Sequence, residues 1–190
     1  MVIIKRCEWA NSNDLEEQYH DNEWGTPSYD DATLFESLIL ESMQAGLSWS
    51  TILKKRDTLR KAYDGFDVDK ISQYTTDKVE LLMNDEGVIR HRLKIQATIS
   101  NAQSFKLIQN EYGSFSDYIW SFVDFKPIIN SWETIKSVPS STELSDKISK
   151  DLKSRGFKFL GTTTVYAFMQ SVGLVDDHVV DCFRRTGITN

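Results

Sequence analysis

Cysteine and histidine occur in two pairs, far apart in the sequence, at spacings typical of metal ligands. Cys7 is followed by twelve residues and then His20, whereas His178 is followed by three residues and then Cys182. Thiolate and imidazole groups are ligands that zinc takes in closed tetrahedral sites. On a helix, residues four apart share one face, so His178 and Cys182 would lie one turn from each other. The four residues predict a zinc ion that clamps the N-terminal segment to the C-terminal one.

The cysteines also admit other interpretations. They are the only two in the chain, and they could form a disulfide or lie in the core as small apolar side chains. The segment before Cys7 is too short for an export signal, which predicts a reducing cytoplasm and disfavours the disulfide. We therefore expect one structural zinc ion per chain.

One acidic residue interrupts an apolar helical stripe. The segment 31–45 has the pattern of a helix, and Glu41 lies three positions after Leu38 and seven after Leu34, on the apolar face. A buried carboxylate is costly unless it is paired, and burial raises its pKa, so such a group is a candidate for a functional site. A buried salt bridge or a helix end near solvent would also explain it. Trp49 follows closely, and an indole beside a carboxylate suits a flat, nitrogen-rich ligand with positive charge.

A second candidate site lies in the stretch 155–162, between two segments expected to be helical. Gly156 and Gly161 bracket a tight turn, and Gly161 with Thr162 opens a helix whose free N–H groups suit a phosphate. Lys158 adds positive charge within the turn. This is the helix-hairpin-helix pattern, which grips a DNA backbone without reading its sequence. A corner between two packed helices would have similar glycines.

Helical periodicity runs through most of the chain, and no sustained alternation of apolar and polar residues indicates a strand. Ser48 is the expected cap of one helix, and Ser140 with Glu143 forms a capping box for another. The expected helices cover residues 31–45, 49–63, 77–84, 89–112, 115–123, 140–155 and 162–172, and a short one carries His178 and Cys182. The pattern predicts an all-α fold of about nine helices, with an irregular connection at 125–140.

The composition is that of a globular protein with an acidic surface. The 190 residues are 40% hydrophobic, enough for a sizeable core, and the net charge is −6. No apolar run approaches the roughly 18 residues that span a bilayer, so we expect a cytoplasmic protein with no membrane partner. A net negative charge argues against a broad nucleic-acid-binding surface. Basic clusters at 54–61, 90–94 and 150–158 could still form a small footprint, although each could equally be the solvated face of a helix.

With these residues in view, the chain closely resembles the bacterial 3-methyladenine DNA glycosylase I (TAG) family. The stretch Tyr19–Gly25, with the distant His178 and Cys182, is highly specific for that family. The other matching stretches follow in order along nearly the whole chain: Cys7–Trp9, Leu40–Glu41, Gln44–Trp49, Ile89–Ala97, Trp120–Phe122, Arg155–Phe159, Gly161–Thr163 and Asp177–Val180.

The resemblance implies a helix-hairpin-helix superfamily fold, with two intertwined helical lobes in a single domain, residues 1–190, whose terminal segments are joined by zinc. The implied zinc ligands are Cys7, His20, His178 and Cys182. The residues implied around an extruded base are Glu41, Trp9, Tyr19, Trp24 and Trp49, with Glu41 bonded to the adenine edge. The implied DNA contacts are Gln44, Gly46 and Leu47, in a loop pushed into the duplex, and Lys158, Gly161 and Thr162 in the hairpin.

The activity implied by the resemblance is excision of 3-methyladenine from alkylated double-stranded DNA, by a protein expected to be a monomer. Glycosylases flip the target base out of the duplex. Methylation at N3 gives the adenine a positive charge that weakens its glycosidic bond. Water can then attack the sugar without a lysine nucleophile, so the enzyme is expected to be monofunctional.

Two details of the sequence bear on this expectation. Glu16 stands three positions before Tyr19, where the family often has an aromatic residue, which predicts a more polar or open cavity wall. Asp176 and Asp177 lie where many superfamily members carry a catalytic aspartate, although Asp177 could instead support the ligand His178. A zinc hydrolase and a non-catalytic DNA-binding module are the rival classes. The first needs an open coordination position, and the second needs no buried carboxylate.

Overall fold

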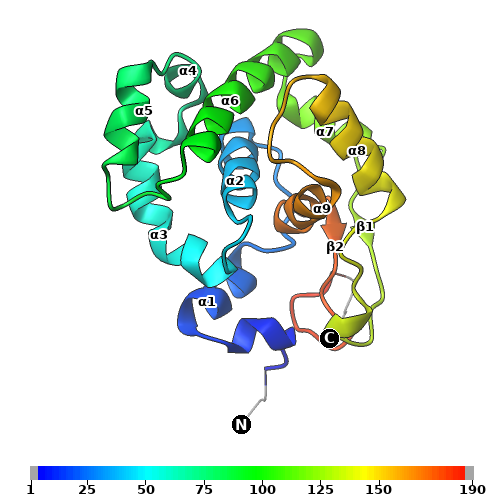
Figure 1. The fold of residues 1–190 in the computed structure, drawn as a ribbon. Helices are drawn as coiled ribbons and strands as arrows, with labels where there is room; N and C mark the ends of the chain where they lie inside the picture. The colour runs from blue at the N-terminus through cyan, green and yellow to red at the C-terminus, as the bar shows by residue number, and fades with distance from the viewer. Residues whose placement is uncertain (1–3, 187–190) are drawn as a thin grey trace.

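The computed structural model describes residues 4–186, whose regular secondary structure is almost entirely helical (Figure 1). Within this range the all-α expectation is confirmed by nine α-helices: α1 (Asp14–Asn22), α2 (Asp31–Met43), α3 (Trp49–Ala62), α4 (Val68–Ile71), α5 (Thr76–Met83), α6 (Arg92–Tyr112), α7 (Phe115–Ser121), α8 (Glu143–Ser154) and α9 (Thr162–Ser171). The shorter elements are the 3-10 helices η1 (Glu8–Asn11), η2 (Asp64–Phe66) and η3 (Ile135–Ser137), and the strands β1 (Ile128–Ile129) and β2 (Val175–Asp176).

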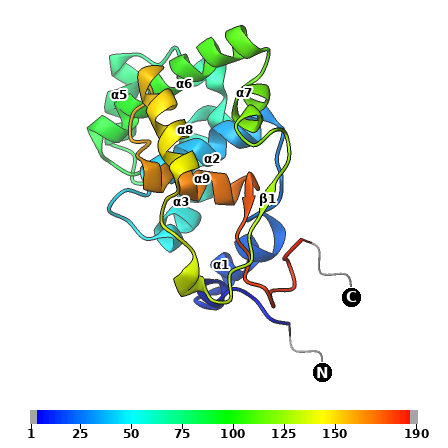
Figure 2. The same ribbon diagram turned by 90° about the vertical axis from the view of Figure 1, so that its right-hand side faces the viewer.

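Helix α2 runs through the middle of the molecule, as Figures 1 and 2 show. Leu34, Leu38 and Ile39 are fully buried in the core. The helix packs against α3, α6, α7 and α9. Asp30 caps its N-terminal end, because the Asp30 carboxylate accepts a hydrogen bond from the N–H of Thr33 at 2.9 Å. The C-terminal end of this buried helix is where Glu41 lies.

Two further groups of helices surround α2. Helix α6 packs against α4, α5 and α7, while α8 packs against α9. Helix α6 begins at Arg92 rather than at Ile89, because the His91 ring accepts the N–H of Lys94 at 3.3 Å and caps the helix there. None of the helices among residues 4–186 has the length and apolar character needed to cross a membrane.

The two ends of the described chain lie side by side (Figures 1 and 2). The N–H of Phe183 donates to the carbonyl of Lys5 at 3.0 Å, and the Lys5 ammonium pairs with Asp181 at 2.7 Å. Helix α1, which was not expected from the sequence, packs beside them on η1 and α3. The residues predicted to hold zinc are therefore gathered at this end of the molecule.

The helix expected over residues 140–155 is present as α8, but Ser140 is not its cap. The Thr142 hydroxyl accepts the N–H of Ser145 at 3.2 Å, and the Ser145 hydroxyl accepts the N–H of Thr142 at 2.8 Å. The expected pairing of Ser140 with Glu143 was wrong, because Glu143 is already the first helical residue.

The short helix expected to carry His178 and Cys182 was also wrong. Asp176 ends strand β2, which pairs with β1, and the chain then turns. The Asp176 carboxylate accepts the backbone N–H of His178 at 3.1 Å and that of Thr186 at 2.9 Å. Local side-chain bonds of this kind compete with helix formation. The rest of the connection at 125–140 is mostly irregular, as expected.

Candidate active site

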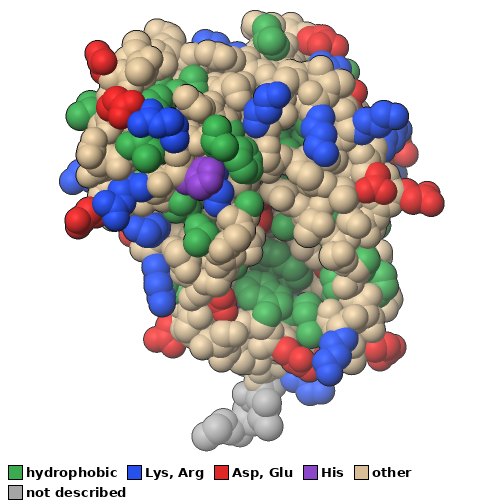
Figure 3. All heavy atoms as spheres, in the orientation of Figure 1, with side chains coloured by type: hydrophobic (Ala, Val, Ile, Leu, Met, Phe, Trp, Pro, Cys, Tyr) green, Lys and Arg blue, Asp and Glu red, His purple; other side chains and the backbone are tan. Residues whose placement is uncertain are grey.

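The predicted aromatic residues and Glu41 meet around one cavity. Its volume is about 380 Å³. Figure 3 shows the molecule hollowed on this face, with apolar side chains inside the hollow. The residues that line the cavity are Trp9, Ser12, Glu16, Tyr19, Trp24, Glu41, Gln44, Trp49, Ile135, Ala167 and Gln170. All five residues predicted to surround a base therefore lie on its wall, together with Gln44.

The aromatic walls come from separate elements that pack against one another. The rings of Trp9 and Trp24 meet edge to face, with their centroids 5.2 Å apart. Those of Tyr19 and Trp49 are tilted, also with a centroid distance of 5.2 Å. Aromatic contacts of this geometry add stability beyond the area that they bury. The walls are thus fixed by their own packing before any ligand enters.

Glu41 has only 5% of its surface exposed. Burial raises the pKa of its carboxyl to about 8, and no charged or hydrogen-bonding group of the described residues opposes that shift. The salt bridge that would have explained Glu41 without a ligand is therefore absent from residues 4–186. A buried acid without a partner favours a ligand that brings a positive charge or hydrogen-bond donors.

The raised pKa of Glu41 makes stability depend on pH. The carboxyl has an ordinary pKa of 4.5 and a folded-state pKa of about 8. Below pH 4.5 the carboxyl is protonated in both the folded and the unfolded state, and its full contribution to the free energy of unfolding is present. As pH rises from 4.5 towards 8 this contribution is lost, because the unfolded chain releases the proton first. Between pH 5 and pH 8 we expect the wild type to lose about 3 kcal/mol of unfolding free energy relative to Glu41→Gln. Urea unfolding of both proteins at the two pH values measures this, and identical pH dependence would contradict it.

The loop at residues 44–47 joins α2 to α3 beside the cavity. Gln44 lines the cavity, while Leu47 is 38% exposed. Gly46 has a φ of +78°, a conformation that glycine adopts without strain. The three predicted contacts of this loop are therefore continuous with the cavity and turned partly to solvent.

Lys94 of α6 holds this loop in position, a role that the sequence did not suggest. Its ammonium donates to the carbonyl oxygen of Met43 at 2.8 Å and to that of Ala45 at 2.6 Å. These are carbonyls at the C-terminal end of α2, where a positive charge also complements the helix dipole. Burial lowers the pKa of Lys94.

The predicted DNA-contacting hairpin connects α8 to α9 and does not line the cavity. Lys158 is exposed, and Gly161 is the N-cap of α9. Thr162 is the first residue of α9, and its hydroxyl lies 2.8 Å from that of Ser145. Phe159 is 37% exposed and has a φ of +56°, a strained conformation for a phenylalanine.

Asn101 explains how this hairpin is held, and sequence analysis missed it. The side chain is fully buried in α6. Its Oδ1 accepts the N–H of Lys158 at 2.7 Å, and its Nδ2 donates to the carbonyl of Lys158 at 3.0 Å. Two bonds from one rigid helix fix the backbone of the hairpin beside the strained Phe159.

Replacing Asn101 with alanine is expected to weaken duplex binding by about tenfold, because loss of two buried hydrogen bonds, at about 1 kcal/mol each, frees the hairpin. Binding of the free base should stay within twofold, since the hairpin lies outside the cavity. Fluorescence anisotropy with duplex DNA and calorimetry with 3-methyladenine give the two affinities. Asn110→Ala, at an exposed position of the same helix, is the matched control. Equal weakening of base and duplex binding would count against a hairpin role.

Three of the four predicted zinc ligands form a compact buried group. The ligand atoms of Cys7, His20 and Cys182 all lie within 4.8 Å of one another. Both cysteines are free thiols, so the disulfide interpretation was wrong. The close approach of the two thiols lowers the pKa of Cys182 and raises the pKa of Cys7.

His178 lies next to this group. Its ring centroid is 5.0 Å from that of His20, and its Nε2 is buried without a hydrogen-bond partner among the described residues. The Nδ1 atoms of the two rings lie 2.8 Å from carboxylate oxygens, Asp176 for His178 and Asp21 for His20. Carboxylates commonly orient metal-binding histidines in this way. Two thiols and two imidazoles, one with an orphaned nitrogen, fit a tetrahedral zinc ion.

The group of cysteines and histidines proposed to bind zinc also supports the cavity wall. Trp24 lines the cavity, and its ring meets that of His178 at a centroid distance of 4.7 Å. Gly25, with a φ of +74°, leaves room for the same imidazole, because a Cβ there would lie 2.6 Å from the ring. Any other residue at this position would push the histidine away.

Asp176 and Asp177 are both buried, and neither lines the cavity. Asp176 is occupied by His178 and Thr186. The carboxylate of Asp177 accepts hydrogen bonds from four side chains: Asn130, Trp132, Tyr166 and Gln170. Both aspartates therefore have structural partners, and direct contact with a base in the cavity is not supported.

Glu16 lines the cavity, as the departure from the family pattern predicted, and makes one wall more polar. Sequence analysis missed four other lining residues: Ser12, Ile135, Ala167 and Gln170. They carry no motif of their own, and their positions follow only from the packing of η1, η3 and α9 around the aromatic cluster.

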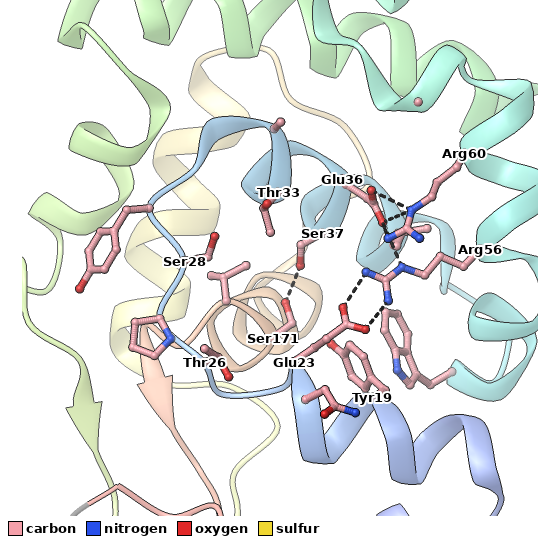
Figure 4. Close-up of a pocket in the computed structure, with 18 residues that line it drawn as sticks. Tyr19, Glu23, Thr26, Ser28, Thr33, Glu36, Ser37, Arg56, Arg60 and Ser171 are labelled. Atoms are coloured by element: carbon pink, nitrogen blue, oxygen red, sulfur yellow. Dashed lines mark hydrogen bonds and ion pairs between the residues drawn. The ribbon is translucent and has the colours of Figure 1, made fainter.

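A second cavity, of about 580 Å³, lies on the other side of Tyr19 and Trp49 (Figure 4). Its charged residues already pair with each other. Arg56 bonds to Glu23 and Glu36, and Arg60 also bonds to Glu36. These pairs tie α2 and α3 to the segment after α1 and leave no free charge to bind a ligand there.

Comparison with known proteins agrees with this geometry. A family model described as methyladenine glycosylase matches residues 9–185. The DNA-3-methyladenine glycosylase of Haemophilus influenzae is 49% identical over 97% of this chain and 100% of its own length. DNA-3-methyladenine glycosylase 1 of Escherichia coli is 48% identical over 94% of this chain and 96% of its own.

Solved structures agree as well. A crystal structure of 3-methyladenine DNA glycosylase I (TAG) has a TM-score of 0.92 and 48% identity, covering 95% of this chain and 100% of that one. A structure that addresses 3-methyladenine recognition by the Staphylococcus aureus enzyme has a TM-score of 0.92 and 39% identity, over 95% of this chain and 96% of that one.

This mostly helical fold, with its indole-walled cavity and buried acid, and these matches together identify a DNA glycosylase, a repair enzyme that excises a damaged base. The match over residues 9–185 and the two curated relatives show which family of glycosylases this is. The chain belongs to the methyladenine glycosylase family.

Proposed function

We propose that this enzyme removes 3-methyladenine from alkylated double-stranded DNA, acting as a monomer in the bacterial cytoplasm. The observation that carries the proposal is the unpaired, buried carboxyl of Glu41 within an aromatic cavity. A neutral apolar pocket would hold any purine, whereas an acid without a partner favours a base that carries positive charge and amino hydrogens. Both of the curated relatives bear the name DNA-3-methyladenine glycosylase.

Recognition combines stacking with charge. Trp9, Tyr19 and Trp49 present electron-rich rings, which attract a cationic base more than a neutral adenine. Trp24, which also lines the cavity, packs edge to face against Trp9. Glu41 accepts hydrogen bonds from the adenine edge, and the positive charge of the bound base favours the ionised form of Glu41 by attraction.

The chemistry needs little acid assistance. The target base must first leave the duplex, at a cost of a few kcal/mol of unstacking. The bond between C1′ of the sugar and N9 of the base then breaks, and both of its electrons go to the base, which leaves as a neutral molecule. Water forms the new bond to C1′ and gives up a proton to solvent. Within residues 4–186 no lysine lines the cavity, which supports a monofunctional enzyme without a covalent lysine intermediate.

DNA contacts are proposed for two segments. Gln44, Gly46 and Leu47 enter the gap left by the flipped base, because they extend from the cavity to solvent on a loop fixed by Lys94. Lys158, Gly161 and Thr162 grip the backbone, with the N-terminal end of α9 directed at a phosphate. The buried Asn101 supports the second segment.

Zinc is proposed as a structural ion held by Cys7, His20, His178 and Cys182. Four protein ligands leave no position for a reactive water, so the metal takes no part in hydrolysis. Its role is to join the N-terminal segment to the one that follows β2, behind the Trp24 wall.

The deciding experiment measures free bases released from methylated duplex DNA by the purified protein, separated chromatographically. Release of 3-methyladenine without strand cleavage supports the proposal. Duplex binding without base release would favour a non-catalytic DNA-binding module. Hydrolysis that stops when zinc is removed, although the protein remains folded, would favour a zinc hydrolase.

A further inference from the structure

Gln170 lies on the cavity wall, but the orientation of its amide is set by a residue that does not line the cavity. Gln170 belongs to α9 and shares the lining with Glu41 and Trp49. Its Nε2 donates to Oδ2 of Asp177 at 2.8 Å. Because an amide has one donor end and one acceptor end, this bond leaves Oε1 as the free end.

The surroundings of Asp177 exclude the opposite orientation. The carboxylate is only 1% exposed. Asn130 and Trp132 donate to its Oδ1, while Tyr166 and Gln170 donate to its Oδ2. Turning the amide over would set two oxygens against each other and leave a buried acceptor without one of its donors. The hydrogen-bond network therefore decides which end of the amide faces which way.

Oε1 of Gln170 remains open to the cavity. Within residues 4–186, no N–H or O–H group donates to it, since the one side-chain bond of Gln170 uses Nε2. The buried side-chain polar atoms that lack a partner there belong to Trp49, His178 and Arg184. Gln170 Oε1 is not among them, so it is accessible, and the residue that carries it lines the cavity.

We propose that Gln170 Oε1 is a specificity element that accepts a hydrogen bond from the exocyclic amino group of the extruded purine. The inference rests on the proposed function and deepens it. Adenine carries an amino group at C6, whereas guanine carries a carbonyl oxygen there. An adenine-type base therefore presents a donor to Gln170 Oε1, which can accept its hydrogen bond. A guanine-type base presents a second acceptor, which cannot bond to Oε1. Glu41 and Gln170 together offer one acceptor for each amino hydrogen.

The test compares two free bases that differ only in this group. 3-Methylpurine lacks the amino group of 3-methyladenine, and both bind without DNA. Calorimetry should show that the wild type binds 3-methyladenine about tenfold more tightly, and that Gln170→Met, which leaves the bond to Glu41, reduces the ratio to about threefold. A merely structural role would weaken both bases equally. Gln73→Met, at an exposed position far along the chain, is the matched control, and melting temperatures of all proteins verify folding.

The outcomes separate this inference from the proposed function. If Gln170→Met folds and keeps the wild-type ratio, the role of Gln170 is overturned. If the wild-type protein binds 3-methyladenine and 3-methylpurine equally, the role of Gln170 is overturned by that measurement alone. In methylated DNA, Gln170→Met should also raise the release of 3-methylguanine relative to 3-methyladenine by about fivefold. Absence of any 3-methyladenine release by the wild type would refute the proposed function. The ratio of affinities for 3-methyladenine and 3-methylpurine would still test the role of Gln170.

Discussion

Replacing Glu41 with glutamine is expected to slow release of 3-methyladenine from alkylated DNA by about 100-fold or more. The side chain keeps its size, but it loses the negative charge that faces a cationic base at a position only 5% exposed, where such interactions are stronger than in water. Glutamine also presents an amide donor towards the donor edge of adenine. Single-turnover release of the free base measures the effect on the chemical step.

Two measurements accompany this prediction. Binding of uncharged adenine should change little in Glu41→Gln, because no charge attraction is lost. Glu86→Gln removes the same charge at an exposed position outside the cavity and should release base at the wild-type rate. Wild-type kinetics in Glu41→Gln would remove this residue from the mechanism.

Replacing Cys182 with alanine is expected to abolish zinc binding and to lower stability by about 4 kcal/mol when free zinc exceeds its dissociation constant a thousandfold. For a chain of this size that corresponds to a fall in melting temperature of roughly 10 °C. The reason is that the metal binds the folded state, in which Cys7, His20 and Cys182 lie together. Metal analysis of the purified protein and thermal unfolding measure the two effects.

The second cysteine supplies the control for this variant. Cys7→Ala should cause the same loss, and the double variant should be no less stable than either single one, because one lost ligand already releases the ion. A chelator should lower the melting temperature of the wild type but not that of Cys182→Ala. A Cys182→Ala protein that keeps its metal and its melting temperature would contradict the clamp.

The residues that could be predicted are those whose chemistry is unusual for their local pattern. Glu41 stood out because a carboxylate interrupts an apolar stripe, and that argument needs only helical periodicity. Cys7, His20 and Cys182 stood out because their residue types are rare in this chain, and the structure brings them together. The helix expected around His178 failed because periodicity does not reveal a side chain such as Asp176 that binds its own backbone.

Residues that act through distant partners could not be predicted in this way. Asn101 holds the backbone of Lys158, 57 positions away. Lys94 reaches carbonyls of the loop after α2, 49 and 51 positions earlier. Gln170 takes its orientation from Asp177, which belongs to a network that includes Asn130 and Trp132. Single-sequence patterns carry local preferences, whereas these contacts exist only once the helices have packed.

The cluster formed by Cys7, Tyr19, Trp24, Val179 and Cys182 has a consequence for the order of events during synthesis. His20 and Cys182 are 162 positions apart. At ribosomal elongation rates, the indole-bearing segment would wait roughly 10–30 s for its counterpart to be made. A nascent chain that stops short of Val179 would lack two of the residues against which Tyr19 and Trp24 pack. The aromatic wall that carries Tyr19 and Trp24 can therefore reach its final packing only after residues 179–182 have been made.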